Sequence, residues 1–452
     1  MMGVLFSSTN GQAPSVDIKD ALLTGQAPDR GLYLPEQFPV LPAETIAAFR
    51  DKPYSEIAVE VLSEYTAGTI DHSVLRSICS DAYDFEVPLE HIYDRVHILR
   101  LDRGPTASFK DFAARLMARL IGRFVREEGR QLTVLTATSG DTGSAVANAF
   151  HGVDGIRVLV LFPISEVSDR QRKQMTTLQD NIRSIALDGK FDDCQALVKQ
   201  AFADPALRGL SLSSANSINI GRLLPQSVYY FYAASRVADA GEPLVVVVPS
   251  GNFGNMMGAV VAQKMGLPIK RLVVPVNAND EFPAFLQTAT YEKIAPSRAC
   301  ISNAMNVGHP SNLVRLVDIY GGWLDETGVM RRDPDIQALR QDLFSSSVTD
   351  EATRQTIEDA WNQYGALLEP HGAVAWRGFL DYTRREPLDG APAVVAETAH
   401  PAKFPDEIEK ILGIKPETPP SLARLDTLNE DFDRLDADYK SFRDYLLRNY
   451  SS

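Results

Sequence analysis

The sequence contains few cysteines, and they are far apart. Its 452 residues include only Cys79, Cys194 and Cys300, and no two of them form a CxxC pair. A zinc site built on paired cysteines and a disulfide framework are therefore both disfavoured. The seven histidines include no HExxH motif and no other close pair at ligand spacing, so we expect no metal. Cysteine usage of this kind favours the reducing cytoplasm.

Excess positive charge and long apolar runs are also absent. The formal net charge is −14, and so acidic a chain is not expected to bind nucleic acid or an anionic membrane surface. The longest apolar runs, such as LVVVV at 244–248, are strand-sized, whereas a membrane helix needs about 20 residues. The opening MMGVLFSSTNGQ has no basic region and no apolar run of signal-peptide length. We therefore expect no membrane partner and a cytoplasmic location.

What the chain does contain is an alternation of short apolar runs with helical patterns. Hydrophobic residues make up 44% and charged residues 23%, which is typical of a globular protein. Strands are expected to open the segments 132–150, 244–266 and 391–404 and to fill 156–163 and 271–276. Strands buried on both faces, alternating with helices, indicate a doubly wound, mostly parallel α/β fold. Ligands of such folds bind at the carboxyl ends of the strands.

The two ends of the chain differ from this central pattern. At roughly 150 residues per domain, the length suggests two or three domains. Residues 1–95 are proline-rich at 26–42 and helical in pattern at 54–65, which suggests a small accessory domain. Residues 96–410 form the α/β region. Residues 411–452 are charged and have helical spacing near the end, so we expect a C-terminal helical tail.

Lys110 lies where a loop becomes a helix, in GPTASFKDF. Phe112, Leu116, Leu120 and Phe124 follow at every fourth position, as in an amphipathic helix. An ammonium group is disfavoured at a helix N-terminus, because the helix dipole presents positive charge there. A neutral, nucleophilic amine is favoured instead. On this segment alone, a solvated surface lysine remains the alternative.

Three further loops follow expected strands. PSGNFGN at 249–255 offers unhindered backbone amides at a helix N-terminus, which suits a phosphate group; a tight structural turn is the alternative. TSGDTG at 138–143 adds two hydroxyls and suits a small carboxylate, although it would also serve as a helix N-cap. Thr398 ends the last expected strand, where the alternative is a plain strand-end turn.

A nucleophilic lysine, a phosphate loop, a carboxylate loop and a hydroxyl at neighbouring strand ends describe a pyridoxal phosphate enzyme that acts on an amino acid. The segments GPTASFKDF, LTATSGDTGSAVANAF, QMTTL, NSIN, PSGNFGN and TAHPAKF resemble, in order and spacing, the signatures of the threonine synthase family. DRGLYLPEQFP at 29–39 resembles the N-terminal domain of that family. The resemblance covers nearly the whole chain. It implies a fold type II enzyme that converts O-phospho-L-homoserine and water to L-threonine and phosphate.

The resemblance also implies roles for individual residues. Lys110 would hold pyridoxal 5'-phosphate as a Schiff base and act as the catalytic base, in a site between two subdomains of the α/β region. The other residues that it implies are Gly251, Asn252, Phe253, Gly254 and Asn255 for the cofactor phosphate, Thr398 for the pyridine nitrogen, and Ser139, Asp141 and Thr142 for the substrate carboxylate. Lys173 and Arg222, beside QMTTL and NSIN, are candidates for the substrate phosphate; solvated surface charge is the alternative for both.

The chain departs from the usual family pattern at three positions. Arg103 stands where a histidine is usual before GPT, Gly372 where PHTAV is usual, and Asn10 where STRG is usual. The cofactor motifs are intact, so these departures bear on substrate choice rather than on cofactor binding.

Three other functions remain to be weighed. Another fold type II lyase, such as a serine or threonine dehydratase, would share Lys110 and a phosphate loop. A non-catalytic relative would bind a phosphorylated ligand but need not keep the lysine. A nucleotide-dependent oxidoreductase is disfavoured because the GxGxxG fingerprint is missing. We expect a small-molecule substrate as the partner and a monomer or homodimer.

Overall fold

Two largely parallel sheets organise the computed structural model, which describes residues 3–450. The five-stranded sheet has the order β15-β7-β6-β5-β8, with every neighbouring pair parallel. Its strands are β5 (Leu132–Ala137), β6 (Ile156–Pro163), β7 (Ile182–Asp188), β8 (Leu212–Ser214) and β15 (Asp433–Asp436). Every residue of β5 is buried, as its mostly apolar, β-branched sequence predicts for a strand covered on both faces.

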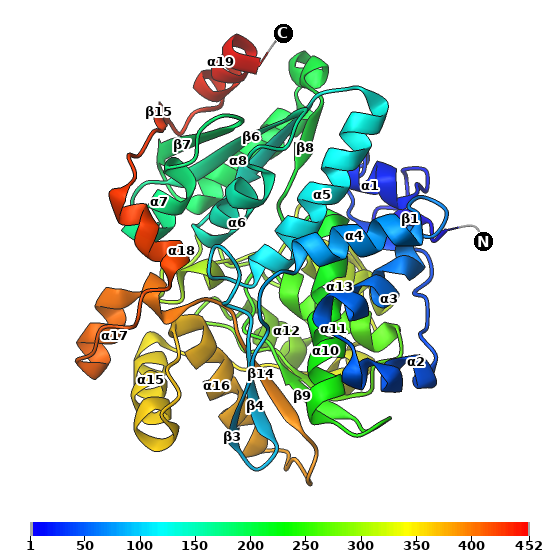
Figure 1. The fold of residues 1–452 in the computed structure, drawn as a ribbon, viewed down its shortest axis with the longest axis vertical. Coiled ribbons are helices and arrows are strands. Elements are labelled where there is room, and N and C mark those ends of the chain that lie inside the picture. Colours follow the sequence, from blue (N-terminus) through cyan, green and yellow to red (C-terminus); the bar gives the residue numbers. More distant parts are fainter. Residues whose placement is uncertain (1–2, 451–452) are drawn as a thin grey trace.

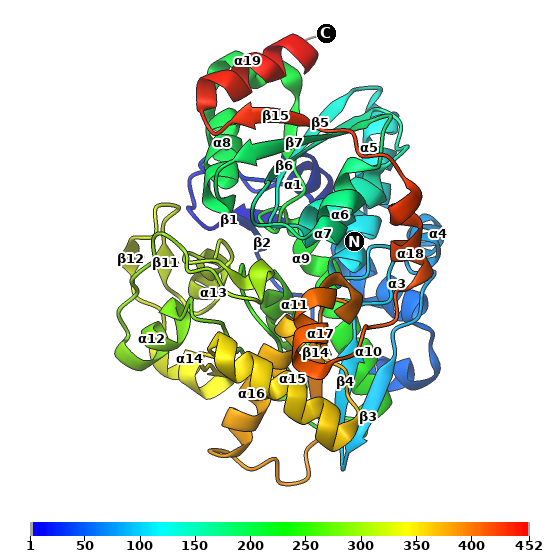
Figure 2. The same ribbon diagram turned by 90° about the vertical axis from the view of Figure 1, so that its left-hand side faces the viewer.

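The six-stranded sheet has the order β13-β10-β9-β14-β4-β3 and is parallel except for the β3–β4 pair at its edge. Its strands are β3 (Leu89–Tyr93), β4 (Val96–Arg100), β9 (Leu244–Val247), β10 (Ile269–Val273), β13 (Leu343–Phe344) and β14 (Ala393–Glu397). Figure 2 shows this sheet below the five-stranded one. The doubly wound α/β fold and each of the five strands expected from the sequence are confirmed.

Helices cover both sheets (Figure 1). Around the five-stranded sheet lie α5 (Lys110–Glu128), α6 (Asp141–Phe150), α7 (Asp169–Thr176), α8 (Phe191–Ala203) and α19 (Tyr439–Tyr450). The helices of the other half are α9 (Ile220–Leu223), α10 (Val228–Val237), α11 (Gly254–Lys264), α12 (Glu281–Thr288), α13 (Leu313–Ile319), α14 (Ile336–Asp342), α15 (Asp350–Tyr364), α16 (Pro370–Thr383) and α17 (Pro405–Leu412). A short hairpin of β11 (Trp323–Leu324) and β12 (Met330–Arg332) completes this part. The helix α18 (Pro420–Ala423) lies beside α7, where Arg170 donates to the Leu422 carbonyl at 3.1 Å. No helix among residues 3–450 is both long and apolar enough to cross a membrane.

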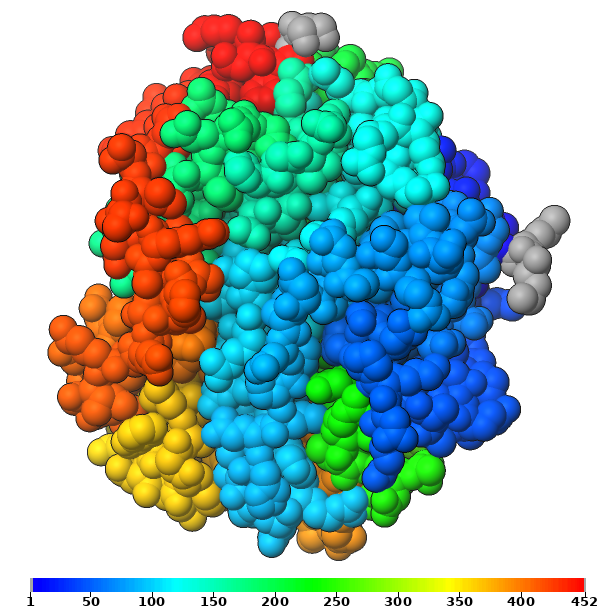
Figure 3. Space-filling model, viewed as in Figure 1, coloured from blue at the N-terminus to red at the C-terminus, as the bar shows by residue number. Residues whose placement is uncertain are grey.

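The N-terminal segment packs on the rest of the chain rather than around a core of its own. It contains β1 (Phe6–Ser8), α1 (Ile18–Thr24), β2 (Tyr33–Pro35), α2 (Ala43–Ala47), α3 (Tyr54–Thr66) and α4 (His72–Ala82). Buried side chains of α3 belong to the same hydrophobic cluster as strand β9, and Figure 3 shows the segment, in blue, pressed against the body. Strand β3 pairs with β4, so the domain boundary expected at residue 95 falls inside a hairpin.

The C-terminal segment contributes a strand as well as the expected terminal helix. Helix α19 forms where the sequence predicts it and buries Phe442, Leu446 and Tyr450 in the core beside the five-stranded sheet. Strand β15 pairs in parallel with β7. The segment expected as a C-terminal helical tail therefore also adds an edge strand to the sheet.

Candidate active site

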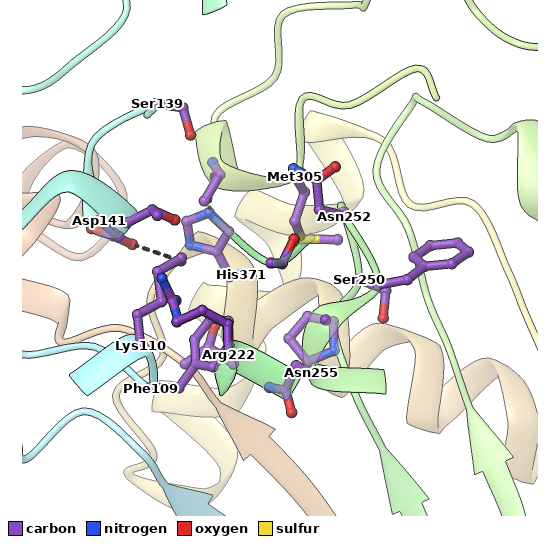
Figure 4. A pocket seen from close by; sticks show the side chains of 18 of the residues that line it. Phe109, Lys110, Ser139, Asp141, Arg222, Ser250, Asn252, Asn255, Met305 and His371 are labelled. Carbon is purple, nitrogen blue, oxygen red and sulfur yellow. Dashed lines mark hydrogen bonds and ion pairs between the residues drawn. The ribbon is translucent and has the colours of Figure 1, made fainter. Parts of the chain in front are cut away.

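A pocket lies where the loops at the strand ends of the two sheets meet. About 800 Å³ of space not filled by atoms lies within it, including its opening to solvent. The side chains that line it come from both halves of the molecule (Figure 4). They include Phe109, Lys110, Ser139, Asp141, Thr142, Phe191, Asn216, Arg222, Gln226, Asn252, Phe253, Asn255, Met305, His371 and Thr398.

Lys110 is the first residue of α5, as the sequence predicts. The chain just before it is anchored to the end of β14, because the Phe109 N–H donates to the Thr398 carbonyl at 2.9 Å. The Lys110 side chain is 12% exposed, with Nζ 3.7 Å from Oδ2 of Asp141. Burial, helped by the nearby charges of Lys403 and Arg222 and opposed by Asp141, lowers the pKa of Lys110 to about 8. An appreciable share of this amine is therefore neutral near physiological pH.

Asp141 is a buried carboxylate that faces two lysines. Its Oδ1 lies 2.8 Å from Nζ of Lys403 and accepts a 3.0 Å hydrogen bond from Gln171. Burial opposes ionisation, but Lys403 and Lys110 outweigh it and hold the pKa of Asp141 well below its usual range. Because an ionised side chain repels a second carboxylate, only the backbone of Asp141 suits a substrate carboxylate, beside Ser139 and Thr142.

The loop 249–255 runs from the end of β9 into the first turn of α11. Phe253 has a φ of 62°, an uncommon conformation for a residue other than glycine. A Cβ on Gly251 would lie 2.9 Å from Cα of Met305 and 3.0 Å from the Ala304 carbonyl oxygen, so only glycine fits. The first amides of α11 have no partner within the helix and carry the positive end of its dipole.

Asn255 adds a side-chain donor to this loop. Its Oδ1 accepts hydrogen bonds from the hydroxyls of Tyr229 and Tyr230, which fixes the orientation of the amide. Its Nδ2 is buried, and no residue in the described range accepts from it. A phosphate oxygen would satisfy this unpartnered donor. The loop, the buried lysine and the hydroxyl of Thr398 together fit pyridoxal phosphate.

The two basic residues expected at the substrate phosphate have different positions. Arg222 lines the pocket, is 3% exposed, and donates to the Ala215 carbonyl at 2.7 Å. Burial lowers its pKa to about 10. Lys173 does not line the pocket; its Nζ lies 3.3 Å from Asp426 of the C-terminal segment. The structure therefore places Lys173 outside this pocket, where its helix directs it toward an acidic partner.

His371 and Lys403 belong to this region but were not chosen as site residues from the sequence. His371 Nε2 accepts from the Ala304 N–H at 3.1 Å, and Nδ1 therefore donates to Glu369, 2.5 Å away. It ties α16 to the turn that packs against Gly251. His371 directly precedes Gly372, one of the departures noted above, and Lys403 falls within TAHPAKF. Both segments were therefore singled out from the sequence, although these two residues were not.

The departures from the family pattern have local explanations at two of the three positions. A Cβ on Gly372 would lie 1.5 Å from Oε2 of Glu397, so the absent side chain makes room for a buried carboxyl group. Asn10 accepts a hydrogen bond from Nε1 of Trp323 at 3.2 Å and does not line the pocket. Arg103 is 3.5 Å from Asp102, and nothing in the structure explains its replacement of histidine.

Metal ligands are not gathered in this region. Across residues 3–450, no cluster of three or more His, Cys, Asp or Glu side chains could hold a metal ion. The charged groups that line the pocket are instead Lys110, Asp141 and Arg222. They form the local basic site that an anionic ligand requires in an acidic protein.

Comparison with known proteins agrees with this chemistry. Three family models match: "Threonine synthase N terminus" over 5–83, "Pyridoxal-phosphate dependent enzyme" over 87–398 and "Threonine synthase, C-terminal" over 372–446. The threonine synthase of Haemophilus influenzae is 39% identical over 437 residues, 96% of this chain and 97% of the relative. The crystal structure of threonine synthase from Brucella melitensis, described as bound to PLP, superposes with a TM-score of 0.90 at 35% identity and covers 100% of both chains. That from Escherichia coli gives 0.89 at 34% identity and covers 98% of this chain and 99% of the other.

Proposed function

This chain belongs to the threonine synthase family of pyridoxal-phosphate-dependent enzymes, and we propose that Lys110 is the residue on which its reaction depends. The enzyme is a threonine synthase, which converts O-phospho-L-homoserine and water to L-threonine and phosphate. The assignment of Lys110 is carried by one observation. Its buried amine, at the start of α5, faces the same pocket as the glycine-rich loop 249–255.

We propose that the cofactor is held by three sets of groups. Lys110 would bind it covalently, the amides of 251–255 with Nδ2 of Asn255 would bind its phosphate, and the Thr398 hydroxyl would bind its pyridine nitrogen. Two observations support the phosphate assignment: Nδ2 of Asn255 has no acceptor among the described residues, and the backbone at Gly251 lies too close to Met305 for a side chain. Bound pyridoxal phosphate supplies an electron sink that makes the substrate Cα–H acidic.

Different side chains of the pocket transfer protons and orient the substrate. Lys110 Nζ removes the proton at Cα and carries protons to and from Cβ and Cγ, for which a lowered pKa suits it. Ser139, Thr142 and the Asp141 N–H orient the substrate carboxylate. Arg222, buried at the pocket wall, binds the substrate phosphate and stabilises it as it leaves; water then adds at Cβ.

The assay that tests this assignment follows both products at once. Holoenzyme is mixed with O-phospho-L-homoserine, and released phosphate and formed threonine are measured together, with Lys110→Ala as the variant. We expect equal yields from the wild type and none from the variant, which should fold normally. Near-normal turnover by Lys110→Ala would remove the proposed role.

A dehydratase side activity is the second chemistry that the same lysine supports. Serine or threonine supplied to the holoenzyme would then yield ammonia and an oxoacid. We expect this activity to be minor beside that on O-phospho-L-homoserine, because Arg222 provides a basic partner for a phosphate leaving group. Brisk deamination without turnover of the phosphorylated substrate would favour the dehydratase.

We also propose a cytoplasmic enzyme that acts as a monomer or homodimer and does not bind nucleic acid. All three cysteines are free thiols, two of them buried, which suits a reducing compartment. The net charge of −14 opposes phosphate-backbone contacts. Light scattering would give the oligomeric state, and a mobility-shift titration with duplex DNA should show no complex at physiological salt.

A further inference from the structure

Arg315, in α13, is a fully buried cation without a carboxylate partner. Its side chain donates to the carbonyls of Tyr33 at 3.0 Å, Ser217 at 2.9 Å and Ile218 at 2.6 Å, and to Oδ1 of Asn312 at 2.6 Å. All four acceptors are neutral, and no acidic oxygen of the described chain lies within 4 Å. Burying an unpaired charge is costly, and burial alone lowers the pKa of Arg315 to about 9. The protein therefore maintains an uncompensated positive charge at this point.

Asn312 connects that charge to the loop 249–255. Its Oδ1 faces Arg315, so its Nδ2 must face the opposite way, where it donates to the Asn252 carbonyl at 2.8 Å and to Oγ of Ser217 at 3.0 Å. The Asn312 N–H also points at the Asn252 carbonyl, at 3.4 Å. A single side chain thus separates the guanidinium from the backbone of the glycine-rich loop.

We propose that Arg315 and Asn312 are positioning residues for the cofactor phosphate. Asn312 holds the loop in its binding conformation, and the negative charge of the bound phosphate balances the positive charge of Arg315. Because Arg315 also binds the Tyr33 carbonyl, the N-terminal segment contributes to cofactor affinity although no residue before 109 lines the pocket. This inference rests on the proposed placement of the cofactor phosphate at residues 251–255.

The test compares a ligand with and without the phosphate. Affinities of the apoenzyme for pyridoxal 5'-phosphate and for pyridoxal are measured by equilibrium dialysis, for the wild type and Arg315→Met. We expect the variant to bind pyridoxal 5'-phosphate at least about tenfold more weakly, equivalent to about 1.4 kcal/mol, while pyridoxal affinity changes little. Equal losses for both ligands would mean a general structural role and would overturn the proposal.

A matched control exists in α10. Arg236 donates to the carbonyls of Phe49, Arg50 and Lys52, so it also joins the N-terminal segment to the body through backbone acceptors. It does not line the pocket. Arg236→Met should lower the melting temperature yet leave the ratio of the two affinities unchanged. A change in that ratio as large as for Arg315→Met would overturn the proposal.

Two more variants complete the test. If Arg315→Met does not fold, Asn312→Ala keeps the guanidinium and removes the side chain that connects it to the loop 249–255. This variant should show the same phosphate-selective loss; unchanged selectivity would overturn the proposal.

Gly251→Val tests the placement of the cofactor phosphate at residues 251–255, since its side chain would collide with the backbone of Met305. If Gly251→Val binds pyridoxal 5'-phosphate normally, the placement itself is wrong. If it loses binding but the Arg315 and Asn312 variants do not, only the present inference fails.

Discussion

At the scale of single residues, Lys110 and Lys403 share one carboxylate but differ in access. Lys403 is fully buried and donates to both Asp141 and the Thr106 carbonyl, each at 2.8 Å, whereas Lys110 faces the pocket. Lys403 partly neutralises Asp141 and so weakens the pull of that carboxylate on the Lys110 ammonium. Lys403 is thereby placed to help keep the neutral form of Lys110 available.

This arrangement predicts the effect of Lys403→Met on pH dependence. The substitution removes a positive charge that lowers the pKa of Lys110, so that pKa rises from its present value of about 8. A shift of about one unit is expected for a nearby charge. Covalent capture of pyridoxal phosphate needs the neutral amine, so its rate should rise with pH through a midpoint about one unit higher than in the wild type. Stopped-flow absorbance at a series of pH values measures this midpoint.

The control for that measurement is Lys173→Met. Lys173 lies outside the pocket and pairs with Asp426, so its loss should leave the midpoint unchanged. An unchanged or lower midpoint in Lys403→Met would contradict the role given to Lys403.

A second prediction at this scale concerns Gly372 and Glu397. Gly372→Ala places a Cβ against the Glu397 carboxyl and should lower the free energy of unfolding by about 1–3 kcal/mol, as overpacking does. In a Glu397→Ala background the obstruction is absent, and the same change should instead stabilise by up to about 1 kcal/mol, because alanine is the better helix former. Urea unfolding of the wild type, the two single variants and the double variant measures the coupling energy between the two positions. Additive effects would show that the two positions are independent.

At the scale of secondary structure, strands that are buried could be predicted from the sequence, whereas an exposed strand could not. Strands β5 and β6 are mostly apolar, and all of their residues but Arg157 are buried, so their positions followed from the residues. Strand β15 was not predicted, because Asp433–Asp436 contains two aspartates and an arginine and no residue of it is buried. Its pairing with β7 depends on backbone hydrogen bonds at a sheet edge, which require no particular side-chain pattern.

Helix α19 provides a stability prediction at this scale. Leu446 is fully buried between α19 and the core of the five-stranded sheet. Leu446→Ala should lower the free energy of unfolding by about 2–5 kcal/mol, as large-to-small core substitutions do. Guanidinium unfolding measures the loss, and affinity for pyridoxal phosphate at low temperature should be unchanged because α19 does not line the pocket. A loss of affinity with unchanged stability would contradict this separation.

At the scale of the whole molecule, the sequence predicted most of the residues that line the pocket but not Arg315, which lies behind its glycine-rich loop. Its loops could be predicted because parallel strands bring their carboxyl ends to one edge, and Lys110, Arg222 and Thr398 do meet there. Arg315 could not be found in this way. Its acceptors come from the N-terminal segment and from the loop before α9, and only the folded chain brings those parts together.

The position of the pocket also predicts a movement. Ser139 and Thr142 line it from the five-stranded half, whereas Asn252 and Thr398 line it from the six-stranded half. A ligand that binds both sets should draw the halves together, which would exclude water until phosphate has left. Small-angle X-ray scattering of the holoenzyme with a non-reactive phosphonate analogue of the substrate should show a smaller radius of gyration. An unchanged profile would count against a large closure.

Strand β14 lies between β9 and β4 in the middle of the six-stranded sheet, although it is one of the last strands in the chain. During synthesis on the ribosome, almost 300 residues are added between the β3–β4 hairpin and β14, the strand that joins this hairpin to the rest of the sheet. Thr398, at the end of that same strand, emerges with it. A nascent chain therefore cannot assemble the cofactor site early, and the edges of β4 and β9 that pair with β14 stay open until synthesis is nearly complete. Such late pairing exposes a growing chain to aggregation, so aggregation should compete with folding until β14 has emerged.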